Sequence, residues 1–194
     1  MLYYAVYKPF GMLSQFSPEG DKPTLAGLGN FPKDVYPVGR LDADSEGLLI
    51  LTNDKRINSK LLHPEEKRSK TYYAQVEGDI SLEAIENINR GVEITVKGKK
   101  YRTLPAKCQK ISEPILPERN PPIRFRKNLP TSWISLRVEE GKNRQVRKMT
   151  AAVGFPTLRL VRWAVEELCI DGMKPGQVDS MRLDELKSKI HIRI

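Results

Sequence analysis

The stretch Val38-Gly39-Arg40-Leu41-Asp42-Ala43-Asp44-Ser45-Glu46-Gly47-Leu48-Leu49-Ile50-Leu51-Thr52-Asn53-Asp54 joins a polar loop to an unbroken apolar segment. The apolar run 48–51 predicts a strand that is buried on both faces. Such a strand holds the preceding loop against a rigid scaffold, so we expect Asp42 to be fixed in place. By themselves, Arg40 and Asp42 also fit a surface ion pair, which contributes less than about 1 kcal/mol.

Short strands and short helices alternate on both sides of this stretch. Alternating or β-branched residues predict strands at 2–7, 72–76, 92–96, 101–108 and 133–138, with one or two more from Thr157 through the polar tail. Capping residues and apolar spacing predict helices from Asn53 or Asp54 to Pro64, from Ser81 to Gly91 and from Lys142 to Val153. This pattern indicates an α+β fold with a mixed, mostly antiparallel sheet and a few short helices. No linker or repeat interrupts it, so residues 1–194 are predicted to form a single domain.

The chain is basic, and the excess charge is concentrated. Its net charge is +9, and residues 119–148 contain nine Lys or Arg against two Glu. This distribution favours an anionic partner such as nucleic acid. Five prolines in residues 112–130 predict an extended loop in the same region.

Several classes of protein are excluded by what the sequence lacks. Cys108 and Cys169 are too few for a disulfide framework and indicate a reducing cytoplasm. With His63 and His191 they show no zinc-ligand spacing. No apolar stretch is long enough to span a bilayer, and no glycine-rich phosphate loop is present. We therefore expect no metal, no nucleotide or other cofactor, and no membrane partner.

Four separate motifs occur in an order that resembles the bacterial ribosomal RNA pseudouridine synthases, in the branch of the small-subunit enzyme RsuA. The motifs are Lys8-Pro9-Phe10-Gly11, Gly39-Arg40-Leu41-Asp42 with the strand after it, Lys70-Thr71-Tyr72, and Glu140-Gly141-Lys142-Asn143-Arg144-Gln145-Val146-Arg147-Lys148-Met149. The resemblance implies the pseudouridine synthase catalytic fold. Because the first motif begins at Lys8, no S4-type RNA-binding domain is expected ahead of it. The missing module is one feature shared with members that modify 23S rRNA. The others are Pro121-Pro122-Ile123-Arg124, Pro130-Thr131-Ser132-Trp133 and the stretch 150–159.

The resemblance also implies roles for individual residues. It assigns the essential carboxylate to Asp42, the active-site tyrosine to Tyr72 and the basic partner of the carboxylate to Arg147. Arg40 resembles the residue that relatives insert where the target base has left the helix. The remaining motif residues imply contacts with RNA, and they are Lys8, Lys70, Lys142, Asn143 and Arg144.

The implied reaction is the isomerisation of uridine to pseudouridine, by a monomer and without a cofactor. An ionised Asp42 can attack C1′ or C6 of the nucleotide or stabilise positive charge on the ribose, and Arg147 would keep it ionised. Tyr72 can stack on uracil with its oxygen near C5, whose proton must leave. Attack at C1′, attack at C6 and an elimination route all stay open.

Two other functions fit some of the same residues. A non-catalytic RNA-binding or ribosome-assembly protein would use the same basic surface, with Arg147 binding phosphate and Tyr72 acting as an ordinary strand tyrosine. A metal-dependent nuclease would use Asp42, Asp44 and Glu46 as ligands. Only the catalytic hypothesis requires Asp42 for pseudouridine formation.

Overall fold

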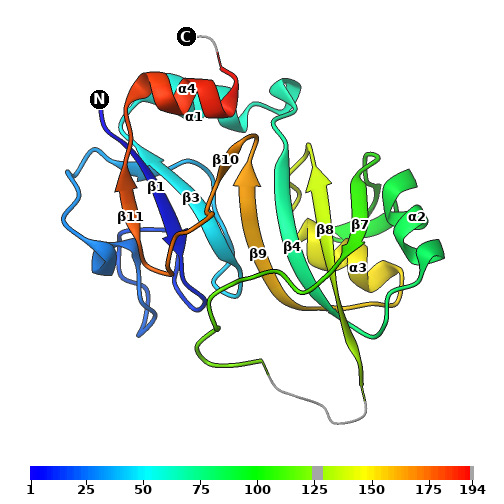
Figure 1. Cartoon of the computed structure of the whole chain (residues 1–194). Helices are drawn as coiled ribbons and strands as arrows, with labels where there is room; N and C mark the ends of the chain where they lie inside the picture. Colours follow the sequence, from blue (N-terminus) through cyan, green and yellow to red (C-terminus); the bar gives the residue numbers. More distant parts are fainter. Residues whose placement is uncertain (124–128, 193–194) are drawn as a thin grey trace. The chain divides into compact units, whose positions relative to one another are not determined.

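The computed structural model describes residues 1–123 and 129–192 and divides into two compact units (Figure 1). The first unit contains residues 1–68 and the chain from residue 161 onward, and the second contains residues 69–160. The boundaries fall directly before β4 (Lys70–Glu77) and inside β9 (Thr157–Val165). Neither boundary has the composition of a linker, and the single-domain assignment stays a prediction.

The strands of the first unit are arranged around β3 (Glu46–Thr52). This strand is antiparallel to β1 (Tyr3–Lys8) and to the short β2 (Tyr36–Pro37). It is parallel to β9 where Glu46 and Gly47 face Val161 and Arg162. All seven residues of β3 are buried, which confirms the prediction from its apolar run.

Further elements complete the first unit. β1 is antiparallel to β11 (Val178–Ser180), and β9 forms an antiparallel pair with β10 (Leu168–Cys169). The helical elements are η1 (Leu25–Leu28), α1 (Lys55–Leu62), η2 (Pro64–Glu66) and α4 (Leu183–Ile190). A core cluster joins Leu49 and Leu51 of β3 to Val6, Met12, Leu25 and Val35.

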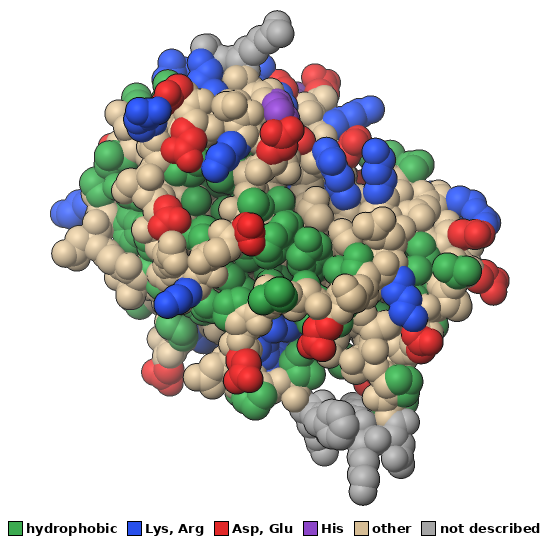
Figure 2. Space-filling model, viewed as in Figure 1, with side chains coloured by type: hydrophobic (Ala, Val, Ile, Leu, Met, Phe, Trp, Pro, Cys, Tyr) green, Lys and Arg blue, Asp and Glu red, His purple; other side chains and the backbone are tan. Residues whose placement is uncertain are grey.

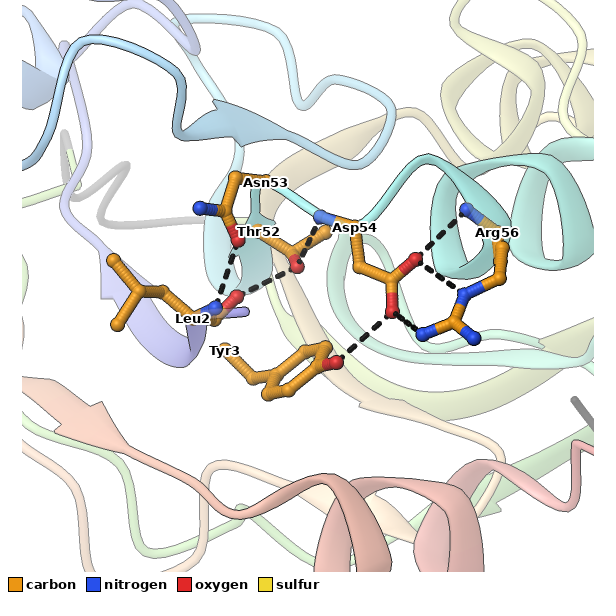
Figure 3. A network of polar contacts seen from close by, with 6 residues as sticks. All are labelled: Leu2, Tyr3, Thr52, Asn53, Asp54 and Arg56. Atoms are coloured by element: carbon orange, nitrogen blue, oxygen red, sulfur yellow. Dashed lines mark hydrogen bonds and ion pairs between the residues drawn. The ribbon is translucent and has the colours of Figure 1, made fainter.

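Asp54 connects the end of β3 to α1 and β1 (Figure 3). Its carboxylate accepts hydrogen bonds from the backbone N–H of Arg56 at 3.0 Å and from the hydroxyl of Tyr3 at 2.9 Å, so it acts as the N-cap of α1. The Arg56 guanidinium donates to both carboxylate oxygens. Next to it, Thr52 donates to the carbonyl of Leu2 at 2.6 Å.

In the second unit, β8 (Thr131–Val138) pairs antiparallel with β4 on one side and with β7 (Lys107–Ile111) on the other. β5 (Glu93–Val96) and β6 (Lys99–Arg102) form a separate hairpin. Helix α2 (Leu82–Arg90) packs beside β7 and α3 (Gln145–Ala152) beside β5 (Figure 1). One core cluster joins these elements, including Ala74, Ile88, Leu136 and Met149. The mixed, mostly antiparallel strand pairing with short helices confirms the predicted α+β fold.

Three segments differ from the sequence prediction. Helix α3 begins at Gln145 and not at Lys142, because Arg144 has a left-handed backbone with φ of 51°. The predicted strand 101–108 is divided into β6 and β7, because Thr103 N–H turns to Val92. The polar tail contains α4, whose buried Leu186 and Ile190 have helical spacing.

The part of the chain seen in the structure holds no helix with both the length and the apolar composition needed to cross a membrane. Residues 124–128, which belong to the predicted loop 112–130 and to the basic stretch 119–148, lie outside the described residues.

Candidate active site

Asp42 lies in a tight turn whose backbone is held by residues 11–14. The N–H of Ser45 donates to the carbonyl of Asp42 at 3.0 Å, which closes the turn. The N–H of Gly11 donates to the carbonyl of Ala43 at 2.7 Å. The Ser14 hydroxyl donates to the carbonyl of Leu41 at 2.8 Å and accepts from its N–H at 3.0 Å. Because these bonds fix the backbone on both sides, the half-buried Asp42 side chain starts from a defined position.

Lys8 supports this turn from inside the first unit. Its side chain is completely buried, and its ammonium donates to the carbonyls of Pro9 at 2.9 Å and Met12 at 2.7 Å. Burial lowers the pKa of Lys8 to about 8, although the negative charges of Glu46 and Asp44 oppose that shift. These contacts favour a role in shaping the segment that binds Ala43, rather than the expected contact with RNA.

Glu46 and Arg162 are two buried charged residues near Lys8, and no sequence prediction assigned them a role in supporting the Asp42 turn. Their exposed fractions are only 2% and 7%, and both influence the pKa of Lys8. The Arg162 Nε donates to the carbonyl of Leu48 at 2.7 Å. The sequence signal was a charge next to or inside an apolar strand: Glu46 precedes the run 48–51, and Arg162 interrupts the apolar residues of β9.

Gly47 allows β9 to approach β3 at this point. Its φ is +105°, and a Cβ atom there would lie 2.3 Å from the carbonyl oxygen of Arg162. Only glycine fits such a contact without a backbone shift. The glycine in the middle of the motif is therefore needed to place the buried Arg162 beside β3.

Arg40 is exposed and follows Gly39, whose φ is +72°. The preceding residue is anchored, because the N–H of Val38 donates to the carbonyl of Ile50 at 2.8 Å. The guanidinium is thus carried on a short segment between two fixed points, Val38 and Leu41. It is accessible to a partner, as the expected role in base flipping requires.

Tyr72 and Lys70 lie on β4 in the second unit. Tyr72 is opposite Leu136 of β8 and packs half-buried against the core of that unit. Its neighbour Tyr73 points to the other face of the strand, because side chains alternate along β structure. Lys70 is half-buried at the first position of the strand.

The remaining predicted residues lie in α3 or directly before it. Lys142, Asn143 and Arg144 are exposed in the preceding loop. Arg147 is half-buried in the helix, and its guanidinium donates to the carbonyl of Thr157 at 3.3 Å. Asp42 belongs to the first unit and Arg147 to the second, so their pairing stays a prediction.

In the described part of the first unit, the carboxylates are not grouped as a metal centre requires. Among the described residues, no three His, Cys, Asp or Glu side chains are grouped so that they could hold a metal ion. The alternative hypothesis of Asp42, Asp44 and Glu46 as metal ligands is therefore not supported by their positions.

Both cysteines are free thiols, and burial raises the pKa of Cys108 to about 12.

A surface pocket in the second unit contains none of the predicted site residues. It lies between α2 and the β5–β6 hairpin, where Ser81, Asn87, Gly91 and Arg102 line it.

Comparisons with known proteins agree with the motifs. Residues 2–152 match the family described as RNA pseudouridylate synthase. The chain is 48% identical over 177 residues to the ribosomal large subunit pseudouridine synthase E of Vibrio parahaemolyticus serotype O3:K6, which covers 91% of this chain and 72% of that protein. It is 45% identical over 180 residues to the protein of the same name from Xanthomonas campestris pv. campestris, covering 90% and 94%.

A solved structure supports the fold independently. The crystal structure of a pseudouridylate synthase aligns with a TM-score of 0.78 at 23% sequence identity, over 97% of this chain and 73% of that chain. At this level of identity the likeness concerns the fold alone.

Proposed function

Because the chain belongs to the RNA pseudouridylate synthase family, we propose that it converts a specific uridine of 23S rRNA into pseudouridine, with Asp42 as the catalytic carboxylate. In this isomerisation the bond between N1 and C1′ breaks, the base turns, C5 bonds to C1′, the C5 proton leaves, and N1 gains a proton. Nothing is oxidised or transferred to another molecule. The observation that carries the proposal is the Asp42 turn, a reactive side chain on a backbone held from both sides.

The proposed role of Asp42 is to act in its ionised form on the ribose or on the base. Its fixed backbone reduces the entropy that would be lost on reaching the reactive geometry. Arg147 is the proposed partner that keeps it ionised, since a guanidinium stays charged and matches a carboxylate with a planar fork. Attack at C1′, attack at C6 and elimination are all compatible with these roles.

Tyr72 is proposed to hold and deprotonate the detached base. Its ring offers a stacking surface for uracil, and its oxygen would lie near C5. The half-buried position of Tyr72 on a regular strand suits this role, because both its ring and its hydroxyl are carried on a rigid element.

A uridine inside a folded RNA must leave the helix before it reaches Asp42, at a cost of a few kcal/mol. Arg40 is proposed to fill the space that the base leaves. Lys70, Lys142, Asn143 and Arg144 are proposed to bind the phosphates around it, which supplies affinity with little sequence information.

The choice of 23S rRNA follows the names of the relatives, which are ribosomal large subunit pseudouridine synthases. We further propose that the protein acts in the cytoplasm as a monomer, on free rRNA or on an assembling particle. The reducing cytoplasm is consistent with its two free thiols.

The test is to incubate the purified protein with unmodified 23S rRNA transcript and to count pseudouridines at single-nucleotide resolution, with and without EDTA. We expect one new pseudouridine, intact RNA and no effect of EDTA. RNA binding without any pseudouridine would instead favour the ribosome-assembly alternative, and RNA cleavage that EDTA abolishes would favour the nuclease.

A further inference from the structure

The β5–β6 hairpin and the loop before α3 are connected by a single carboxylate, that of Glu140. It accepts hydrogen bonds from the Tyr101 hydroxyl at 2.5 Å, from the Leu104 N–H at 2.9 Å and from the Gln145 side-chain amide at 2.6 Å. The acceptor interaction raises the pKa of Tyr101 to about 12, so the phenol stays a donor at neutral pH. The hairpin and the loop are therefore held together as one local structure.

The same loop is closed at its other end. The amide oxygen of Gln145 accepts from the Lys142 N–H at 2.9 Å, and the Lys142 ammonium lies 4.7 Å from the centre of the Tyr101 ring. A cation at this distance from an aromatic face is attracted to it. Tyr101 thus orients Lys142 through its ring and the loop through its hydroxyl.

The two faces of the hairpin differ. Tyr101 is opposite Ile94, and Lys99 is opposite Val96, so Tyr101 and Lys99 share the face that turns toward the core. Lys100 shares the opposite, exposed face with Thr95. Lys100 is also paired with Glu93 at 3.0 Å.

Lys99 is consequently the hairpin cation on the same face as the Tyr101 ring that holds Lys142. Residues two apart on a strand, such as Lys99 and Tyr101, are separated by about 6.6 Å. The long side chain of Lys99 can therefore reach the surroundings of the Tyr101 ring, where the Lys142 ammonium lies. Both ammonium groups belong to exposed residues. The aromatic ring orients Lys142, and Lys99 extends from the same face. Two such cations suit two neighbouring phosphates of a nucleic acid backbone.

We propose that Lys99 and Lys142, arranged around Tyr101 and held by Glu140, form a phosphate-binding pair that grips the RNA backbone outside the target nucleotide. This inference rests on the proposed function, because it takes RNA as the substrate. Lys99 and Lys142 contact RNA directly, whereas Tyr101 and Glu140 are positioning residues. The pair contributes to binding and not to the chemical step.

The hairpin supplies a matched pair of variants, Lys99→Gln and Lys100→Gln, which remove the same charge from neighbouring exposed residues on opposite faces. The dissociation constant for unmodified 23S rRNA transcript is measured by filter binding over a series of salt concentrations. Lys99→Gln is expected to weaken binding several-fold and to make the salt slope shallower by about 1, as for one lost phosphate contact. Lys100→Gln is expected to match the wild type in both.

Tyr101→Phe separates positioning from folding. The variant keeps the ring near Lys142 and loses the hydrogen bond to Glu140. We expect the variant to have a raised KM and an unchanged kcat. The salt slope of its RNA binding should also be unchanged, because no cation is removed. A purely structural role would lower the melting temperature and the active fraction without raising KM.

Equal effects of Lys99→Gln and Lys100→Gln, or no effect of Lys99→Gln, overturn the phosphate pair. The outcome is independent of turnover because binding is measured directly. The dissociation constants of the wild type and the variants can follow the predicted order while the wild type forms no pseudouridine. In that case the proposed function fails and the phosphate pair stands.

Discussion

At the scale of single residues, the proposed site depends on a carboxylate whose backbone is held in place by hydrogen bonds. Asp42 is proposed because its motif resembles that of a known family and precedes an apolar strand, and the hydrogen bonds of Gly11 and Ser14 show how its turn is held. Lys8 was assigned to RNA from its charge and motif position. Its burial was not predictable, because a lysine before a turn is expected at the surface and is rarely fully buried.

A first prediction concerns Tyr72. Replacing it with phenylalanine keeps the stacking ring and removes the oxygen that would accept or relay the C5 proton. We expect kcat to fall by about 10²-fold or more, with little change in KM, in a steady-state pseudouridine assay. The matched control is Tyr73→Phe on the opposite face of β4, which should retain activity. Equal losses in both variants would remove the proposed role of Tyr72.

At the scale of elements, helix caps and apolar runs were predictable, whereas boundaries set by long-range contacts were not. Asp54 and Ser81 cap α1 and α2 as their sequence positions indicate. The division of β6 from β7 depends on hydrogen bonds from residues 103 and 104 to Val92 and Glu140, which are distant in sequence. No local pattern reports such partners.

The close contact of β3 and β9 gives a second prediction. Gly47→Ala places a Cβ atom against the Arg162 carbonyl, whereas Gly172→Ala has a similar positive φ and nothing within 4 Å. The unfavourable φ should cost about 1–2 kcal/mol in both. The collision should cost Gly47→Ala roughly a further 1–3 kcal/mol, measured by urea unfolding. Equal stabilities would show that β9 does not depend on this contact.

The cap of α1 gives a third prediction, on pH. Hydrogen bonds from Arg56, followed by that from Tyr3, hold the pKa of Asp54 well below its usual range. A carboxylate with a depressed pKa in the folded state stabilises the protein above its unfolded pKa of about 3.9. That contribution is lost as the pH falls further.

Wild-type protein should therefore lose unfolding free energy between about pH 4 and pH 2, and Asp54→Asn should lose less over the same interval. The variant should be the less stable of the two at pH 7, where the charge is present in the wild type. Urea unfolding at several pH values checks both expectations. Parallel pH profiles for the two proteins would contradict this role of Asp54.

At the scale of the whole molecule, the sequence indicated a basic RNA-binding protein but not the division into two units. A discontinuous unit is hard to detect from sequence because its two segments are joined only by the fold. On the face seen in Figure 2, Lys and Arg side chains are interspersed with Asp and Glu side chains. RNA binding to this face would therefore depend on particular cations.

A fourth prediction follows from these cations. The logarithm of the RNA association constant should fall linearly with the logarithm of salt concentration, with a slope of about −0.7 to −0.9 for each neutralised phosphate. With Lys70, Lys142 and Arg144 engaged, the slope should be about −2 or steeper. A slope near zero in filter binding would mean that phosphate contacts do not supply the affinity.

The most direct test of the central claim compares Asp42→Asn with Asp44→Asn, two variants in one turn that remove the same charge. The measurement is the yield of pseudouridine in 23S rRNA transcript at equal RNA occupancy. We predict that Asp42→Asn lowers the rate by more than about 10⁴-fold while binding is retained, and that Asp44→Asn keeps most of its activity. Pseudouridine formed by Asp42→Asn at the wild-type rate would contradict the assignment of Asp42 as the catalytic carboxylate.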